Sequence, residues 1–164
     1  MHSYHEPVLA DEVIQLLGPG RAGLYLDGTV GGGGHTRQIL ERCSDCRVLA
    51  VDRDPDAIEH ARRSLAGFAD RVRFLHARFD DAPLDPEARA SGLDGALLDL
   101  GVSSFQIETE SRGFTFRRGV ALDMRMDVSG FPDARSFLAD ASEERLSQVF
   151  RDFGEEPRAR RLAR

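Results

Sequence analysis

Four consecutive glycines, Gly31 to Gly34, stand in the stretch DGTVGGGGHT. Ordering them is costly, because glycine loses more backbone freedom on folding than any other residue. A glycine-rich turn between a strand and a helix lets a ligand approach the backbone, and the first N–H groups of the helix stay open to that ligand. The stretch therefore predicts a cofactor-binding turn, with a flexible surface turn as the alternative.

The glycine turn matches neither of the common phosphate-binding patterns. The Walker A pattern would need a lysine where His35 stands, and the chain contains no lysine. The dinucleotide pattern GxGxxG would need a glycine at Thr36 if it began at Gly31, or at Val30 if it began at Gly28. Nucleoside triphosphates and dinucleotides are therefore disfavoured as ligands.

Asp52 stands at the end of the next apolar run, RVLAVD. A carboxylate about 20 residues beyond a glycine turn can accept hydrogen bonds from both ribose hydroxyls of an adenosine. NAD and S-adenosylmethionine both carry that ribose, and the missing GxGxxG favours S-adenosylmethionine, which has no phosphate. The alternative is that Asp52 caps the following helix, although Asp54 can fill that role.

Further side chains are expected to join Asp52 at one crevice. Asp27 and Asp99 end two other predicted strands, and the carboxyl ends of parallel strands form the ligand-binding edge of a sheet. Carboxylates there would suit a cofactor that carries a sulfonium and an ammonium group. Phe79, just after a third strand, could cover the adenine or could simply pack in the core.

The elements that must position these residues alternate along the chain. Strands are predicted at 24–27, 47–52, 72–76 and 95–100, and helical patterns at 7–17, 35–42 and 55–65, with room for a short helix within 81–92. Such alternation indicates an α/β fold with a parallel sheet and helices on both faces.

The second half of the chain has a different character. Residues 103–130 show no sustained period and predict a long functional loop, and a helix is predicted from Ser142 to Gly154. All 22 basic residues are arginines, and they recur in this half, for example at Arg117 and Arg118. Arginine suits phosphate recognition, so a local nucleic-acid surface is one interpretation, and solvated faces are the other.

Composition bounds the class of protein. A length of 164 residues suits one domain, and a net charge of −6 argues against coating nucleic acid by bulk electrostatics. The sequence has no apolar run that could span a bilayer and no secretory leader, so a cytoplasmic protein is expected. Cys43 and Cys46 form one CxxC without further ligands, which predicts reduced cysteines and no metal site.

Taken together, the motifs HEPVLADEV, YLDGTVGGGGHT, VLAVDRDPDAI, GALLDLGVSSFQ, RGFTFRRGVALDMRMD and FGEEPRARRLAR resemble the bacterial 16S ribosomal RNA (cytosine-N(4))-methyltransferase family. The resemblance runs over essentially the whole chain. It implies a Rossmann-like methyltransferase fold and methyl transfer from S-adenosylmethionine to the exocyclic amino group of a cytidine in the decoding region. It implies 16S rRNA or the small ribosomal subunit as partner, with neither DNA nor a membrane involved, and leaves a homodimer open.

The resemblance also carries over site residues. It implies that the cofactor is bound by Gly33, Gly34, His35, Asp52, Phe79, Asp99 and Gln106, and Asp99 is the candidate catalytic residue. Two positions depart from the family: Phe105 replaces the usual proline, and Pro157 or Arg158 stands where an aromatic is usual. The first departure bears on the placement of Gln106.

The family continues with the rest of an inserted helical domain and three further strands. We therefore expect residues 1–108 to be the N-terminal part of the cofactor-binding domain, and residues 109–164 to be a loop and the beginning of the substrate-recognition insertion. A chain ending there is expected not to methylate RNA by itself. Two alternatives stay open: a non-catalytic remnant that binds cofactor or a ribosomal partner, and an NAD-dependent oxidoreductase.

Overall fold

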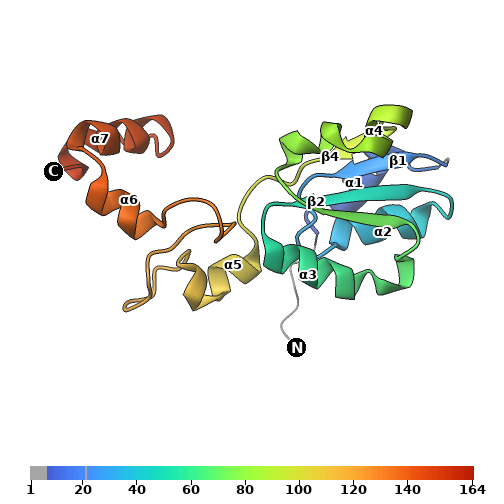
Figure 1. The fold of residues 1–164 in the computed structure, drawn as a ribbon, viewed down its shortest axis with the longest axis horizontal. Helices are drawn as coiled ribbons and strands as arrows, with labels where there is room; N and C mark the ends of the chain where they lie inside the picture. Colours follow the sequence, from blue (N-terminus) through green and yellow to red (C-terminus); the bar gives the residue numbers. More distant parts are fainter. Residues whose placement is uncertain (1–6, 21) are drawn as a thin grey trace. The chain divides into compact units, whose positions relative to one another are not determined.

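The computed structural model describes residues 7–20 and 22–164, apart from the side chains of residues 83 and 84. The chain divides into two compact units, an N-terminal unit (Met1–Ile107) and a C-terminal unit (Glu108–Arg164). Each unit is described by itself below (Figure 1).

The N-terminal unit is built on a four-stranded parallel sheet. Its strands are β1 (Leu24–Asp27), β2 (Arg47–Asp52), β3 (Val72–His76) and β4 (Gly95–Leu97). Their order across the sheet is β3-β2-β1-β4, and all three pairings are parallel. The predicted α/β class with a parallel sheet is therefore confirmed. Strand β4 is shorter than predicted, because after Leu97 the chain no longer pairs with β1.

Helices cover both faces of this sheet. They are α1 (Ala10–Leu17), α2 (Gly34–Arg42), α3 (Pro55–Ser64) and the short α4 (Pro86–Ser91), together with the 3-10 helices η1 (Ala66–Phe68) and η2 (Phe79–Leu84). In Figure 1, α4 lies on one side of the strands and α2 and α3 on the other. Proline opens both α3 and α4 behind an aspartate N-cap, which explains where they begin.

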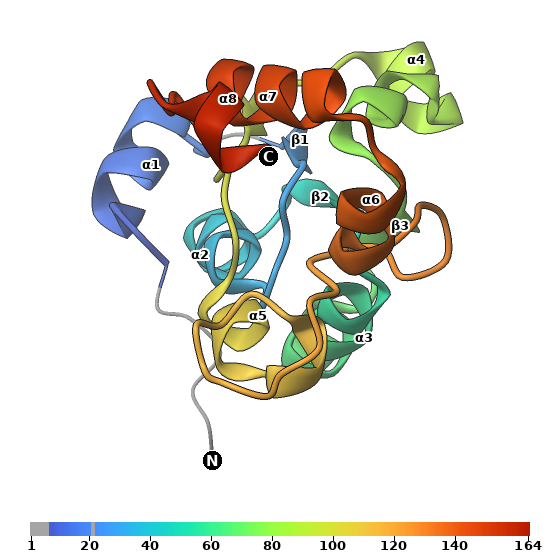
Figure 2. The same cartoon turned by 90° about the vertical axis from the view of Figure 1, so that its left-hand side faces the viewer.

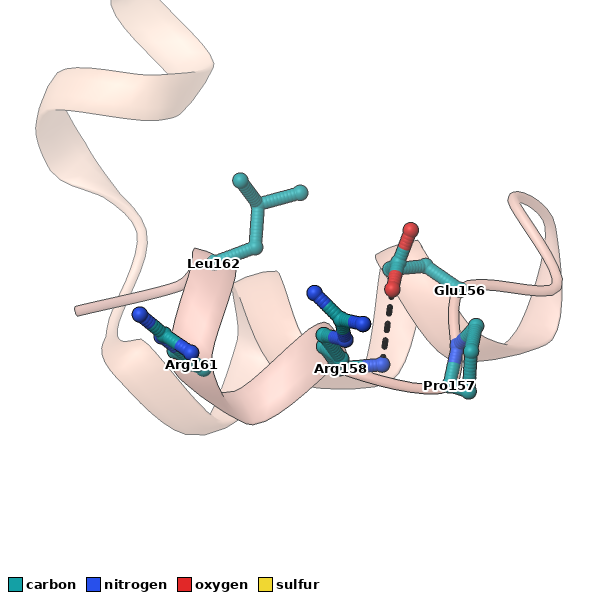
Figure 3. A pocket seen from close by; sticks show the side chains of 5 residues that line it. All are labelled: Glu156, Pro157, Arg158, Arg161 and Leu162. Atoms are coloured by element: carbon teal, nitrogen blue, oxygen red, sulfur yellow. Dashed lines mark hydrogen bonds between the residues drawn. The ribbon is translucent and has the colours of Figure 1, made fainter.

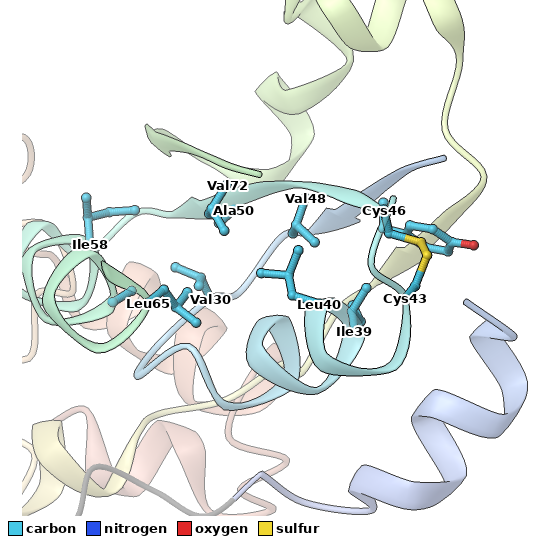
Figure 4. Packing of buried hydrophobic residues seen from close by; sticks show 12 residues of the cluster. Val30, Ile39, Leu40, Cys43, Cys46, Val48, Ala50, Ile58, Leu65 and Val72 are labelled. Atoms are coloured by element: carbon cyan, nitrogen blue, oxygen red, sulfur yellow. A yellow bond between two sulfur atoms is a disulfide. The ribbon is translucent and has the colours of Figure 1, made fainter. Parts of the chain in front are cut away.

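Two apolar layers result from the alternation of side chains along β2. Val48 and Ala50 belong to a buried cluster with Ile39, Leu40 and other residues of α2 and α3 (Figure 4). Leu49 and Val51 point to the opposite face, where a second cluster includes Ala82 and Ala88. Because β2 is buried on both faces, its sequence reads as a continuous apolar run.

The prediction of reduced cysteines is wrong in this structure. Cys43 and Cys46 form a disulfide, with their Cα atoms 5.4 Å apart (Figure 4). Both residues are buried in the first apolar cluster, where the turn between α2 and β2 brings them face to face. The CxxC therefore closes this turn.

The C-terminal unit consists of short helices and a long loop. After α5 (Ser104–Glu108), which ends at the boundary, come the 3-10 helix η3 (Glu110–Arg112), α6 (Ala134–Asp140), α7 (Glu143–Asp152) and α8 (Ala159–Leu162). Figure 2 shows α7 and α8 side by side, and they pack on each other. The helix predicted from Ser142 to Gly154 is α7, which Ser142 caps and which ends at Asp152. Helices α6 and α8 were not predicted, and neither was α5, which lies within the predicted loop 103–130.

The loop before α6 is folded around one buried arginine. Arg112 donates hydrogen bonds to the carbonyl oxygens of Arg125 and Met126, at 3.0 and 2.7 Å. Arg125 also binds the carboxylate of Asp123 through two nitrogens, at 2.9 and 2.7 Å.

Within the described residues, no helix is long and apolar enough to span a membrane.

Candidate functional site

The strand order places a topological switch point between β1 and β4. The chain moves outward from β1 to β2 and β3 and then returns to the other side of β1. In open α/β sheets, ligands bind outside the carboxyl ends of the strands at such a point. The segments that follow the four strands are therefore the candidate ligand-binding elements.

The glycine turn leads directly into α2. Gly33 is the N-cap residue of α2, with a φ of 85°, and a Cβ atom at this position would lie 2.9 Å from Cδ1 of Leu65. Gly33 has no side chain that could cap the helix. The first N–H groups of α2 thus have the arrangement that binds anionic or polar ligand groups.

Gly34 and His35 contact the segment that precedes α1. A Cβ atom on Gly34 would lie 3.0 Å from Cδ of Pro7, so the proline ring packs on the helix start. His35 is buried, and its Nε2 donates to the carbonyl oxygen of Val8 at 2.9 Å. These two predicted cofactor contacts therefore also hold the N-terminal segment, and their role toward a cofactor stays a prediction.

Asp52 joins the end of β2 to the glycine turn. Its Oδ2 accepts from the backbone N–H of Gly31 and its Oδ1 from that of Asp54, both at 2.9 Å. Burial raises the pKa of Asp52, and these backbone hydrogen bonds oppose the rise. Each carboxylate oxygen can accept more than one hydrogen bond, so capacity for ribose hydroxyls remains.

Asp27 lies at the same edge, but it is enclosed. The expectation that it lines the crevice is therefore wrong. It is 1% exposed, and its two oxygens accept from the Thr36 hydroxyl at 2.6 Å and the Thr29 N–H at 3.2 Å. Burial is the largest cause of its raised pKa, with the Thr36 hydrogen bond opposing it. Asp27 thus fixes the glycine turn and α2 relative to β1.

Asp27→Asn is expected to change how stability depends on pH. The raised pKa means that the folded chain binds this proton more tightly than the unfolded chain. The favourable contribution of Asp27 is therefore largest at low pH and is lost as pH rises from 3.8 through the folded pKa. Asparagine does not titrate, and the Thr36 hydroxyl can reverse to accept from its amide.

Urea unfolding of parent and variant from about pH 4 to 8 measures this effect. The stability of the variant relative to the parent should increase as pH rises. A difference that stays constant over the whole range would show that the ionisation of Asp27 does not affect folding.

Phe79 reaches the end of β1 although it follows β3. A Cβ atom on Gly28 would lie 2.9 Å from Cβ of Phe79 and 2.5 Å from Cδ2 of Leu98. The Phe79 residue is 40% exposed and Leu98 is 44% exposed, so neither belongs to a closed core. An aromatic ring in this position is available to stack on a planar ligand.

The backbone of Asp99 is held by a hydrogen bond, and the residue that carries this carboxylate is exposed. Its N–H donates to Oγ1 of Thr29 at 2.7 Å, which ties the segment after β4 to the segment after β1. The N–H of Gly28 likewise donates to the carbonyl oxygen of Leu97 at 3.0 Å. Sequence reasoning missed Thr29, although it stands two residues beyond a strand-end aspartate.

Gln106 is buried in α5 and contacts Asp54. Its Nε2 donates to Oδ2 of Asp54 at 2.7 Å, and its Oε1 accepts from the N–H of Ser103 at 3.0 Å. The N–H of Gln106 donates in return to Oγ of Ser103 at 3.2 Å. The SSFQ segment thus forms a capping box, which is a signal readable in the sequence for the start of α5.

The contacts divide the predicted site residues into linked groups. Asp52 accepts a hydrogen bond from the glycine turn, Gln106 donates one to Asp54, and the Asp99 N–H donates one to Thr29. Together they offer a half-buried carboxylate, an open helix N-terminus, an exposed aromatic ring and an exposed carboxylate. These groups could bind a ribose, a polar ligand end, a purine and a cation. Among the described residues, no cluster of His, Cys, Asp and Glu could hold a metal.

A separate hollow lies within the C-terminal unit. It is lined by Glu156, Pro157, Arg158, Arg161 and Leu162 around the start of α8 (Figure 3). The Arg158 N–H donates to Oε1 of Glu156 at 2.7 Å. The hollow contains none of the predicted cofactor residues, although Pro157 and Arg158 are the positions that depart from the family pattern.

Solved structures similar to part of this chain include an RNA methyltransferase from Salinibacter ruber in complex with S-adenosyl-L-homocysteine. It is 23% identical and has a TM-score of 0.43, and the match covers 48% of this chain and 52% of that one. A SAM-dependent O-methyltransferase from Thermotoga maritima is 18% identical, with a TM-score of 0.42 over 46% of this chain and 29% of that one.

Curated relatives are much more similar in sequence. Ribosomal RNA small subunit methyltransferase H of Oleidesulfovibrio alaskensis is 48% identical over 99% of this chain and 52% of its own length. The protein of the same name from Thermotoga neapolitana is 45% identical over 98% of this chain and 54% of its length. The chain thus spans about half the length of the curated relatives it matches. The model of the MraW methylase family matches residues 2–164, and the chain belongs to that family.

Proposed function

We propose that the protein transfers a methyl group from S-adenosylmethionine to small-subunit ribosomal RNA. The proposed acceptor is the exocyclic amino group of a cytidine in the decoding region. Membership of the MraW methylase family and relatives named as ribosomal RNA small subunit methyltransferases support the class of reaction. Such a substrate would place its action in the cytoplasm.

The observation that carries the cofactor proposal is the hydrogen bond between Asp52 and the glycine turn. The hydrogen bond from the Gly31 N–H to Asp52 links the carboxylate proposed to bind the ribose to the glycine turn that leads into α2, whose N-cap Gly33 has no side chain. Phe79 is exposed next to Gly28 and could cover an adenine. Because S-adenosylmethionine carries no phosphate, it suits a turn that lacks both phosphate-binding patterns.

The proposed chemistry depends on positioning. Bound S-adenosylmethionine would supply an electrophilic methyl group. Cytosine N4 is a weak nucleophile, because its lone pair is delocalised into the ring. The Asp99 carboxylate, or a carbonyl between Leu100 and Ser103, would accept a hydrogen bond from the amino group and favour its pyramidal form, so that N4 attacks the methyl carbon as its bond to the sulfonium sulfur breaks. S-adenosylhomocysteine would leave, and the Asp99 carboxylate or water would take up the released proton. Asp99 is the proposed catalytic residue, and its exposure leaves it accessible to a base that has left its stack.

The proposed RNA surface lies on the loop of the C-terminal unit. Phe116 is fully exposed between Gly113 and Gly119, and Arg117 and Arg118 follow it. Exposed aromatic rings stack on unpaired bases and arginines bind phosphates. This loop could hold an unpaired RNA segment without the whole acidic protein attracting RNA.

The test is a methylation assay with the complete encoded protein. We expect labelled methyl groups to appear as N4-methylcytidine when the protein is given labelled S-adenosylmethionine and small subunits from a strain that lacks its own enzyme of this family. Nucleoside digestion followed by mass spectrometry identifies the modified base. Asp99→Asn keeps the shape but removes the charge, and we expect it to slow single-turnover methyl transfer by about 100-fold or more.

Subunits from a strain with the enzyme provide the control, because their target is already modified and should accept no label. Methylation of a different base or atom would contradict the proposed target and keep the methyltransferase class. Absence of transfer from a complete protein that binds S-adenosylmethionine would contradict the proposed RNA substrate.

A further inference from the structure

Asp54 and Gln106 form a buried polar pair that joins two segments of the N-terminal unit 52 positions apart. Asp54 is 1% exposed and Gln106 is 5% exposed, and the hydrogen bond between them is 2.7 Å. An isolated buried carboxylate would be costly, so its partners decide whether the arrangement is stable.

Hydrogen bonds extend from this pair in both directions. The Asp54 N–H donates to Asp52, which in turn accepts from the Gly31 N–H of the glycine turn. On the other side, Gln106 accepts from the N–H of Ser103, four residues beyond Asp99. A continuous series of contacts therefore connects the ribose-binding position with the segment that would meet the target base.

We propose that Asp54 is a positioning residue that sets the segment from Asp99 to Ser103 relative to the cofactor. This inference rests on the proposed function. Asp54 holds Gln106, Gln106 holds the start of α5, and the same aspartate fixes Asp52 through its own N–H. The position of Asp52, which is proposed to bind the cofactor, and the position of the segment that would contact the target base are then set by the same residue.

The directions of the hydrogen bonds leave little freedom. Both carboxylate oxygens of Asp54 are acceptors, because Oδ1 also caps α3 by accepting from the Asp56 N–H at 3.0 Å. Gln106 must then present its amide nitrogen to Asp54 and its oxygen to Ser103. Rotating the amide would place two donors together at Ser103 and two acceptors together at Asp54, and each mismatch buries polar groups without a partner.

An exchange of amide and carboxylate tests the pair. Asp54→Asn can still cap α3 but presents an amide to the Gln106 amide. Gln106→Glu places two carboxylates in contact within a buried site. The double variant restores one donor and one acceptor, because the new amide can donate to the new carboxylate, which still accepts from Ser103. It also keeps the net charge of the parent, so it controls for charge.

Asp85→Asn is the matched control for a buried capping aspartate. Asp85 is 6% exposed, caps α4 and forms an ion pair with Arg73. Arg73 is the second residue of β3, which is the edge strand on the other side of the sheet from β4. We expect this variant to lose stability with unchanged affinity for S-adenosylmethionine. The comparison separates loss of stability from loss of positioning.

The complete protein is tested by calorimetry with S-adenosylmethionine and by single-turnover methyl transfer. We expect each single exchange at Asp54 or Gln106 to weaken binding by about tenfold and to slow transfer at saturating cofactor, and the double variant to recover to within about threefold of the parent. Slow transfer at saturating cofactor is the readout that stability alone would not change.

Two results would overturn the inference separately from the proposed function. If the parent binds and transfers normally but Asp54→Asn behaves like Asp85→Asn, the pair is only structural. If the double variant folds but recovers neither binding nor transfer, the direction of these hydrogen bonds does not set the site. A parent that binds no S-adenosylmethionine would instead refute the proposed function, and this inference with it.

Discussion

Gly33→Ala is expected to lower the free energy of unfolding of the chain by about 2 to 5 kcal/mol. The φ of 85° at Gly33 lies in the left-handed region, where an L side chain costs roughly 1 to 2 kcal/mol. The new methyl group would also lie 2.9 Å from a Leu65 carbon in the buried cluster, and overpacking of a core costs about 1 to 3 kcal/mol more.

Gly31→Ala is the matched control for this substitution. Gly31 also has a positive φ, of 49°, but among the described residues a Cβ atom there would meet only the Thr29 carbonyl oxygen within 4 Å, at 3.8 Å. It should therefore lose only the backbone contribution, about 1 to 2 kcal/mol. Urea unfolding of both variants measures the difference. Equal losses would show that the contact with Leu65 is not what requires glycine at position 33.

The comparison of Gly33→Ala with Gly31→Ala separates two reasons for the four glycines. Four consecutive glycines before a helix predict close approach of a cofactor, whereas contacts with Leu65 and Pro7 give Gly33 and Gly34 additional steric reasons. A glycine that is already required by packing says less about a ligand than one that is not. Asp52 and its contact with Gly31 are therefore the better evidence for the cofactor proposal.

The strands could be predicted where burial made the pattern continuous. Residues 24–27 and 47–52 were found as predicted, because an apolar run between polar turns suits a covered sheet. Residues 72–76 were also found as predicted, although the exposed Arg73 interrupts their apolar run. The run at 95–100 misled for the same reason. Leu98 and Leu100 are apolar but 44% and 68% exposed, since β4 is at the edge of the four-stranded sheet.

Site residues at strand ends could be predicted, but their partners could not. The position of Asp52 follows from counting along a strand–turn–helix unit. The contacts of Asp54 with Gln106 and of Asp99 with Thr29 join residues 52 and 70 positions apart. Such contacts depend on which strand lies beside β1, and local periodicity does not contain that information. The capping box of α5 was local and could have been found from SSFQ.

Asp52→Ala is expected to weaken S-adenosylmethionine binding about 10- to 100-fold, which corresponds to hydrogen bonds to a charged group of about 1.5 to 3 kcal/mol. The substitution removes the proposed acceptor for the ribose hydroxyls. It also leaves the Gly31 and Asp54 N–H groups without their carboxylate partner, so the glycine turn loses one of its attachments to β2 and keeps the backbone hydrogen bond from Val30 to Val51. Both effects act in the same direction on affinity.

Asp56→Ala provides the control, because Asp56 is exposed in the first turn of α3 and carries the same charge nearby. It should bind S-adenosylmethionine like the parent in calorimetry. Affinity of the parent should also fall at acidic pH, starting above 3.8, because burial raises the pKa of Asp52 and the protonated group is the weaker acceptor. Equal affinity of parent and Asp52→Ala would remove Asp52 from the site and leave the open end of α2 as the main contact.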